Sequence, residues 1–184
     1  MKKLKSYLIE LTIVTIGVLI ALLLNNFKER YEANEFNKAS LKTIKNEVVA
    51  NYSALKEVID KHTGLLEQAK KDSNANVPIG NLISKAGGVT LPTLNNTGLE
   101  FYTRNQIASI DFDIMSTLIS MNKLSDLIDT KLEKLADYVY SDIFAHSKES
   151  RMIFIMYLRN VLESENQLLT VYQNYIDDHN NNEK

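Results

Sequence analysis

The chain of 184 residues contains no cysteine, which excludes a disulfide framework, a thiolate nucleophile and a cysteine-ligated metal site. Its 21 Lys and Arg residues against 23 Asp and Glu residues give a formal net charge of -2, so no overall positive field favours nucleic acid as a partner. The length is sufficient for one domain with a hydrophobic core.

The most apolar part of the chain lies near its amino terminus. Residues 7–24 contain one charged side chain, Glu10, and a helix of about this length crosses the hydrocarbon core of a bilayer. A cleaved signal peptide is the main alternative, because the basic residues 1–5 precede the apolar segment. Signal sequences usually have a shorter apolar region that ends in a small-x-small cleavage site, and this segment has neither feature. We therefore expect a transmembrane signal anchor over residues 7–26, after a cytoplasmic tail of residues 1–6.

Charge does not decide the orientation of this segment. Basic residues are almost equally frequent on its two sides, so the positive-inside rule gives no clear preference. They are Lys2, Lys3 and Lys5 before the segment and Lys28, Arg30, Lys38 and Lys42 after it. A long folded domain can cross a membrane largely regardless of its charge, whereas a short basic tail is easily retained. We expect the amino terminus in the cytoplasm and the rest of the chain outside it.

Three residues of the apolar segment are candidates for pairing inside the membrane. Glu10 either pairs with a partner there or extends to the interface about one helical turn away, and we favour the second reading. Gly17 and Ala21 form a small-xxx-small pair, which allows two helices to pack closely but is also frequent by chance. The expected partners are therefore the lipid bilayer and either a second copy of the chain or a subunit of a membrane complex.

Residues 10–27 also carry a family resemblance. Glu10, the core Gly17-Val-Leu-Ile-Ala-Leu22 and the end Asn25-Asn26-Phe27 resemble the single-span helical envelope proteins of Bacteroidota, a family of unknown function. That family usually has Trp where this chain has Phe27, which is also an aromatic interfacial anchor. Residues 96–110 resemble, more loosely, its short helix and turn before the last two helices. The resemblance implies a periplasmic helical domain on a single-pass anchor in the inner (cytoplasmic) membrane, and it implies no activity, cofactor or catalytic residue.

The segment after the span has helical periodicity up to about Lys71. Its apolar stripe positions recur at intervals of three and four residues, and no proline interrupts them. They are Leu41, Ile44, Val48, Tyr52, Leu55, Ile59, His62, Leu66 and Ala69. The span is therefore expected to continue into a helix of about 45 residues, a stalk that becomes part of a helical bundle. At His62 we expect a partly buried packing residue rather than a metal ligand.

Turn-forming residues interrupt this periodicity over residues 72–110, which we interpret as an irregular insertion. Short helices are expected at about 81–86 and 97–106, the second with Thr97 as its N-cap. Gly87-Gly88 lacks the spacing and the preceding strand of a phosphate-binding loop, so a flexible turn is favoured.

Two further long helices are expected in the rest of the chain. Helical spacing extends from Asp111, which suits an N-cap, to about residue 143, and again over residues 148–177. Residues 144–147 form the break between these helices, and residues 179–184 are expected to be a disordered tail. The apolar positions are Ile114, Leu118, Met121, Leu124, Ile128, Leu132, Leu135, Val139 and Ile143 in the first helix, and Ile155, Leu158, Leu162, Leu169, Tyr172 and Ile176 in the second.

The expected fold class is all-α. One amino-terminal transmembrane helix continues into an antiparallel bundle of three long helices with a short helical insertion. The extracytoplasmic domain is expected to cover residues 27–178.

No group of ionisable side chains has the spacing of a catalytic or metal site. The three histidines lie on different expected elements and form no His-x-x-x-His pair. Asp111 and Asp113 suit a helix N-terminus better than acid–base chemistry or cation binding. Glu163 and Glu165 are expected on a solvated face. We therefore expect no catalytic residue, no metal site and no cofactor, and an enzyme is the least favoured class.

A partner surface is expected near the start of the last helix. Met152, Phe154 and Met156 would form an adaptable apolar contact surface if they are exposed. Tyr138 and Tyr140 suit packing at a bundle boundary better than a ligand groove. The leading hypothesis is a membrane-anchored, non-enzymatic helical envelope protein that acts as a scaffold or as an accessory subunit of a membrane complex. The alternative is an extracytoplasmic, sensor-like module that binds a small ligand between its helices.

Overall fold

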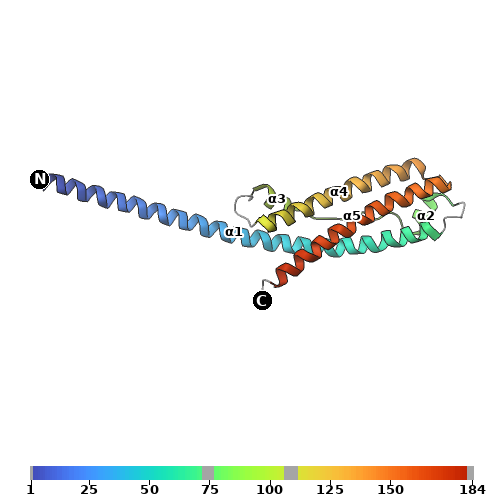
Figure 1. Ribbon diagram of the computed structural model, residues 1–184, viewed down its shortest axis with the longest axis horizontal. Helices are drawn as coiled ribbons and strands as arrows, with labels where there is room; N and C mark the ends of the chain where they lie inside the picture. Colours follow the sequence, from blue (N-terminus) through green and yellow to red (C-terminus); the bar gives the residue numbers. More distant parts are fainter. Residues whose placement is uncertain (1, 72–76, 106–111, 182–184) are drawn as a thin grey trace. The chain divides into compact units, whose positions relative to one another are not determined.

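The computed structural model describes residues 2–71, 77–105 and 112–181. Within these ranges the chain has five helices and no strand (Figure 1). They are α1 (Lys2–Lys71), α2 (Ile79–Lys85), α3 (Thr97–Asn105), α4 (Phe112–Asp142) and α5 (Lys148–Asn181). The predicted all-α class is confirmed.

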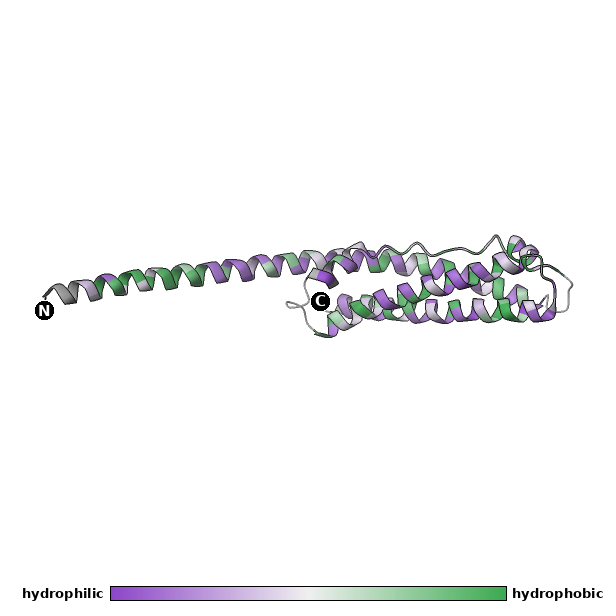
Figure 2. Cartoon of the chain, turned by 90° about the horizontal axis from the view of Figure 1, so that it is seen from above, coloured by the Kyte–Doolittle hydropathy of each residue, from purple (hydrophilic) through white to green (hydrophobic). Residues whose placement is uncertain are grey.

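Contacts divide the chain into two units, Met1–Lys42 and Thr43–Lys184. In the first unit, every described side chain from Ile9 to Phe36 is exposed. Near its amino terminus α1 has a stretch that is long and apolar enough to cross a membrane, visible as continuous hydrophobic colour in Figure 2. The expected helix of membrane-spanning length is present.

In the second unit, the part of α1 after Thr43 contributes a stripe of side chains to the core. Most of the residues that the periodicity indicated are buried, and Asn51, Val58 and Leu65 join them. Leu41 and Tyr52 are only half-buried. The buried members of the stripe are Ile44, Val48, Asn51, Leu55, Val58, Ile59, His62, Leu65, Leu66 and Ala69.

Helices α4 and α5 run in opposite directions. Lys131 Nζ of α4 donates a hydrogen bond to Ser164 Oγ of α5 at 2.7 Å. Further along α4, the Tyr138 hydroxyl donates to the Ser150 carbonyl, also at 2.7 Å. The ring of Tyr138 lies 5.4 Å from that of Tyr157, so this tyrosine serves helix packing, as expected.

Helix α5 also runs opposite to α1. Asn51 Nδ2 lies 3.5 Å from the Tyr172 hydroxyl, and later in α1 His62 Nδ1 lies 3.1 Å from Glu165 Oε2. Helices α1 and α4 therefore point the same way. Residues 88–96, here called the return segment, connect α2 to α3 between them (Figure 1).

The predicted break between the last two helices is confirmed, because α4 ends at Asp142 and α5 begins at Lys148. Ser147 gives the local reason. Its hydroxyl oxygen accepts a hydrogen bond from the Ser150 amide at 3.0 Å, which satisfies one of the donors that the first helical turn leaves open.

Helix α2 contacts this same junction through its backbone. The Ile79 amide donates to the Ala145 carbonyl at 3.0 Å, and the Gly80 amide donates to the Ile143 carbonyl at 2.9 Å. A Cβ atom at Gly80 would lie 2.7 Å from Ile143 Cγ1. The close backbone approach therefore requires glycine at position 80.

Helix α5 differs from expectation in two respects. Helix α5 continues to Asn181, so residues 179–181 belong to its last turn although we expected disorder from residue 179. The ring of His179 stacks on that of Tyr175, with 4.0 Å between ring centroids, which gives this turn a side-chain contact. In α5, Ile155, Leu169 and Ile176 are only half-buried, so the core face is rotated slightly from the predicted one. The expected cap Asp111 lies outside the described residues.

Candidate functional site

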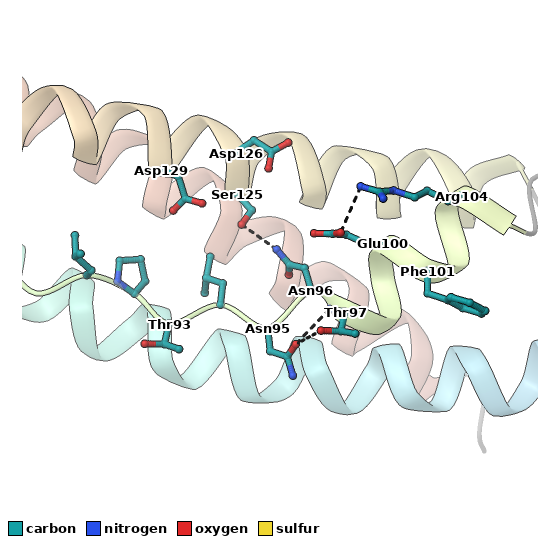
Figure 3. Close-up of a pocket in the computed structure, with 13 residues that line it drawn as sticks. Thr93, Asn95, Asn96, Thr97, Glu100, Phe101, Arg104, Ser125, Asp126 and Asp129 are labelled. Carbon is teal, nitrogen blue, oxygen red and sulfur yellow. Dashed lines mark hydrogen bonds and ion pairs between the residues drawn. The ribbon is translucent and has the colours of Figure 1, made fainter.

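A groove with a volume of about 860 Å³ lies between α4 on one side and the return segment with α3 on the other (Figure 3). It is lined by Leu91, Pro92, Thr93, Leu94, Asn95, Asn96, Thr97, Glu100, Phe101, Arg104, Ser125, Asp126 and Asp129. A second hollow of about 530 Å³ shares Leu91, Pro92 and Asp129 with it and adds Thr130, Leu132, Glu133 and Ala136. Together the two hollows follow α4 for about three turns. We call them the α4 groove.

A polar network that begins in the core holds one wall of the α4 groove. Asn51 on α1 is 3 % exposed. Its Nδ2 donates to the Asn95 carbonyl at 3.0 Å and to Asn96 Oδ1 at 3.2 Å, and its Oδ1 accepts from the Asn95 amide at 2.8 Å. Asn96 Nδ2 in turn donates to Ser125 Oγ of α4 at 3.0 Å (Figure 3). The buried amide of Asn51 therefore connects α1 to the return segment directly and, through Asn96, to α4.

Helix α3 begins where its N-terminus meets a carboxylate of α1. Both oxygens of Glu47 accept hydrogen bonds from the Gly98 amide, at 2.9 and 3.1 Å, and Oε2 also accepts from the Leu99 amide at 3.2 Å. Asn95 Oδ1 accepts from the amide and the hydroxyl of Thr97. These bonds satisfy open donors of the first turn and place a negative charge at the positive end of the helix dipole. Thr97 starts the helix, as expected, but acts as a donor rather than as the capping acceptor.

Carboxylates dominate the charge of the α4 groove. Asp126, Asp129 and Glu100 line it, with Arg104 as the cation, and Arg104 Nη2 lies 3.5 Å from Glu100 Oε2 (Figure 3). Among the described residues, no hydrogen-bond or ion-pair partner contacts the carboxylates of Asp126 and Asp129. Burial and the neighbouring Asp126 raise the pKa of Asp129 above its usual value. The groove thus offers negative charge that no described side chain of the protein neutralises.

A second polar pair is sealed inside the core. His62 of α1 is 1 % exposed and Glu165 of α5 is 0 % exposed. His62 Nδ1 lies 3.1 Å from Oε2 and 3.0 Å from Oε1 of Glu165. No described residue makes a hydrogen bond to the buried Nε2 of His62. A substrate has no access to this acid–imidazole pair, so its role is to join α1 to α5.

Glu165 corrects an expectation. The sequence analysis placed Glu163 and Glu165 together on a solvated face, but only Glu163 is exposed. Glu165 lies three positions before the buried Leu168 and four after the buried Val161, which places it on the core face of α5. The spacing of Glu165 in the sequence indicated burial, but glutamate generally prefers solvent, so the residue type pointed the other way.

Two tyrosines of α5 are also buried. Burial raises the pKa of Tyr172 to about 12, although the hydrogen bond from Asn51 opposes the shift. Burial likewise raises the pKa of Tyr175 to about 12, and the nearby Tyr102 adds to the effect. Both phenols are therefore neutral at pH 7 and suited to packing and hydrogen bonding.

The residues predicted to pair inside the membrane lie in the first unit. Glu10, Gly17 and Ala21 are exposed on α1. A Cβ atom at Gly17 would meet no atom within 4 Å, so glycine is not required there by contacts within this chain. Pairing through these residues stays a prediction.

The predicted partner surface is only partly exposed. Met152 is 62 % and Met156 is 52 % exposed, and with Ile153 and Ile155 they line a shallow hollow on α5. Phe154 is 0 % exposed and belongs to the core, which corrects its assignment to the surface. Residues two positions apart on a helix point about 200° apart, so Phe154 faces away from Met152 and Met156.

Glycine and acidic residues singled out in the sequence have structural roles here. Gly87 and Gly88 have φ values of 85° and 97°, which glycine adopts without strain in the turn after α2. Asp113 is in the first turn of α4, where a carboxylate interacts favourably with the helix dipole. Within the described ranges, no group of three or more His, Asp or Glu side chains is placed to hold a metal ion.

The sequence analysis missed the residues that build the α4 groove. Asn51 and Ser125 occupy stripe positions on their helices, where a small polar side chain is easily taken for a tolerated exception. Their spacing in helical stripes was the available signal. Asn96 carries no such signal, because only the path of the return segment brings it to Asn51 and Ser125.

Comparisons of the chain with protein-family models, with curated proteins and with solved structures found no match.

Proposed function

We propose that this protein is a membrane-anchored, non-enzymatic helical protein that acts as a scaffold or as an accessory subunit of a membrane complex. One observation carries the proposal: the same helix, α1, has an exposed apolar stretch in the first unit and a core-forming stripe in the second. Apolar side chains exposed around a whole helix are unfavourable in water and favourable in lipid. Because α1 is one continuous helix, the proposed anchor is covalently connected to the packed domain.

The proposed location is the inner (cytoplasmic) membrane, with the amino terminus in the cytoplasm and the second unit in the periplasm. The basic residues before the apolar stretch favour retention of that side, whereas a long folded domain can cross a membrane largely regardless of its charge. Protease added to intact spheroplasts should digest the second unit under this orientation and leave it intact under the opposite one.

The proposed architecture is an antiparallel bundle of three long helices with a short helical insertion. The part of α1 after Thr43, α4 and α5 are the long helices, and residues 77–105 belong to the insertion. The hydrogen bonds of α5 to both other long helices support this grouping. A bundle of this type presents side chains at its surface for partner binding without needing a reactive centre.

A non-enzymatic role is supported by the position of the polar core groups. The His62–Glu165 pair, which has the residue types of acid–base catalysis, is sealed from solvent and joins two helices. The exposed Met152 and Met156 side chains, by contrast, are available to a partner protein or to a second copy of the chain.

A pull-down of the tagged full chain from its native membrane in mild detergent tests the scaffold role. We expect a second protein to co-purify in a fixed ratio, or the chain to be recovered as a homo-oligomer. Recovery of a monomer alone at native expression levels would contradict the proposal. A matched chain with Met152→Lys and Met156→Lys reports whether the exposed methionines contribute to the contact.

A sensor-like module that binds a small ligand is the second candidate, and the α4 groove favours it. Its volume of about 860 Å³ lies within the usual range of ligand sites. Glu47 and Asn51 of α1 hold its wall, so an occupied groove would act directly on the helix that carries the apolar stretch. A thermal-shift screen of the full chain against metabolites, ions and envelope fragments should then find a stabilising compound, and a screen without one would contradict this role.

A further inference from the structure

One face of α4 carries three carboxylates along the α4 groove. Asp126, Asp129 and Glu133 are separated by three and four residues, so they share a face at axial spacings of about 4.5 and 6 Å. Figure 3 shows Asp126 and Asp129 on the α4 side, opposite the return segment. Within the described part of the chain, none of the three carboxylates has a hydrogen-bond or ion-pair partner.

The cations of the second unit leave this row uncompensated. Arg104, the basic residue lining the groove, lies beside Glu100, and Lys131 of α4 donates instead to Asn160 and Ser164 of α5. Lys123 and Lys134 are exposed on α4 but do not line the groove. The complement of this charge pattern is a ligand with several cations in a row.

The opposite wall adds an elongated, partly apolar surface. Seven consecutive residues, 91–97, line the groove, and Leu91 is 64 % exposed. Leu132 and Ala136 extend the apolar lining beyond Asp129. The hydrogen bonds from Asn51 and Asn96 fix this wall to α1 and α4. Such a groove is long enough for an extended chain.

We propose that the α4 groove binds an extended, cationic segment of a partner polypeptide. Alternate side chains of an extended segment point the same way at spacings of about 6.6 Å, somewhat more than the axial spacings of about 4.5 and 6 Å between the carboxylates. The long side chains of Lys and Arg can span this difference, so successive cations would meet Asp126, Asp129 and Glu133 in turn. The side chains between them face the other wall, where Leu91 and Leu94 provide apolar contact. About five residues of a partner fit along the three turns of α4.

The inference rests on the proposed function, because it names the chemistry of the partner that the scaffold binds. The two can fail separately. A stoichiometric partner in the pull-down without peptide binding in the groove would leave the scaffold role standing and remove this inference.

Fluorescence anisotropy with the full chain in detergent micelles tests the inference. The probe is a labelled peptide of about six residues with lysine at alternate positions and leucine or threonine between them. The groove variant combines Asp126→Asn, Asp129→Asn and Glu133→Gln. The matched control combines Asp60→Asn, Glu67→Gln and Glu163→Gln, which remove the same charge from exposed positions outside the groove.

We expect the lysine peptide to bind the wild-type chain and to bind the groove variant about tenfold more weakly. Binding to the control should be within about twofold of wild type, and added salt should weaken it. Equal losses in the two variants would overturn the inference, because net charge alone would then explain binding. Spermine that binds as tightly as the peptide would also overturn it, since the groove would then recognise charge and not a polypeptide. Failure of the peptide to bind the wild-type chain would likewise overturn the inference. Melting temperatures equal to that of the wild type show that the variants fold.

Discussion

At the scale of residues, polar groups inside the core have a large influence on stability, because a buried group that loses its partner is costly. His62 and Glu165 come from different helices, and Nδ1 of His62 lies 3.1 Å from Oε2 of Glu165 in a site that is closed to solvent. Removing one partner leaves the other group buried without compensation, which costs more than the pair contributes. A pair of this kind therefore specifies how α1 lies against α5.

The substitution His62→Leu should lower the free energy of unfolding by about 3 kcal/mol, because it leaves the Glu165 carboxylate buried alone. Urea unfolding of the full chain in detergent micelles, followed by circular dichroism, measures this. The neighbouring exposed Glu163→Gln should change stability by less than about 0.5 kcal/mol. The double variant His62→Leu with Glu165→Leu should regain most of the loss. Equal stability of His62→Leu and wild type would show that Glu165 does not depend on this partner.

We expect the protein to lose stability at high pH because of Tyr172 and Tyr175. Their pKa values of about 12 in the folded protein exceed the value of about 10 in an unfolded chain, so folding favours the neutral phenols. The stabilisation is fully present below pH 10 and is lost as pH rises toward 12. Thermal unfolding at a series of pH values, with phenolate absorbance as a second signal, should show this decline.

Phenylalanine variants identify the source of the decline. Tyr172→Phe should make unfolding less dependent on pH between about 10 and 12, because it removes one of the two shifted phenols. Tyr140→Phe is the control, since Tyr140 is 80 % exposed. A pH dependence unchanged by Tyr172→Phe would contradict the role of this residue.

At the scale of elements, short contacts between backbones decide where the insertion lies. The first residues of α2 bond to the end of α4 and to the turn before α5, and Glu47 caps α3 from a position 51 residues earlier in the chain. These contacts explain why two helices of nine residues or fewer persist, although such short helices are marginal alone.

Two glycine substitutions should have opposite effects. Gly80→Ala would place a Cβ atom 2.7 Å from Ile143 Cγ1, so we expect a loss of about 1–3 kcal/mol in unfolding free energy. Gly64→Ala, within α1 and with nothing within 4 Å, should gain about 0.5–1 kcal/mol because alanine favours the helix. Urea unfolding measures both. Shifts in the same direction would contradict the contact between α2 and the α4 end.

At the scale of the whole molecule, we expect the apolar stretch of α1 to determine where the protein resides. Its exposed side chains would have to find lipid or a partner, since burying each one is worth about 1.5–3 kcal/mol.

Replacing Ile16 and Leu19 by lysine should remove the protein from the membrane, because each lysine at the centre of a span costs about 2.5–3.5 kcal/mol. Alkaline extraction of membranes and immunoblotting of pellet and supernatant measure this. Phe112→Lys with Phe144→Lys, two equally drastic changes at exposed sites of the second unit, should leave the protein in the pellet. Retention of the Ile16 and Leu19 variant would show that another part of the protein holds it there.

The sequence by itself determined the features that depend on neighbours along the chain. Helical periodicity, the apolar run over residues 7–24, the turn formers near residues 72–78 and the break at residues 144–147 predicted the all-α class. They also placed most helix limits within a few residues. These signals are local because a helix bonds residues four positions apart and a membrane selects for apolar length.

Only the tertiary structure decided which polar residues meet. Glu165 is buried and Glu163 exposed, and Phe154 is in the core between two exposed methionines, because partner helices set which side of α5 faces inward. The Asn51 network and the α4 groove depend on the return segment crossing between α1 and α4. Residues far apart in sequence are brought together there by chain path and packing, which no local pattern encodes.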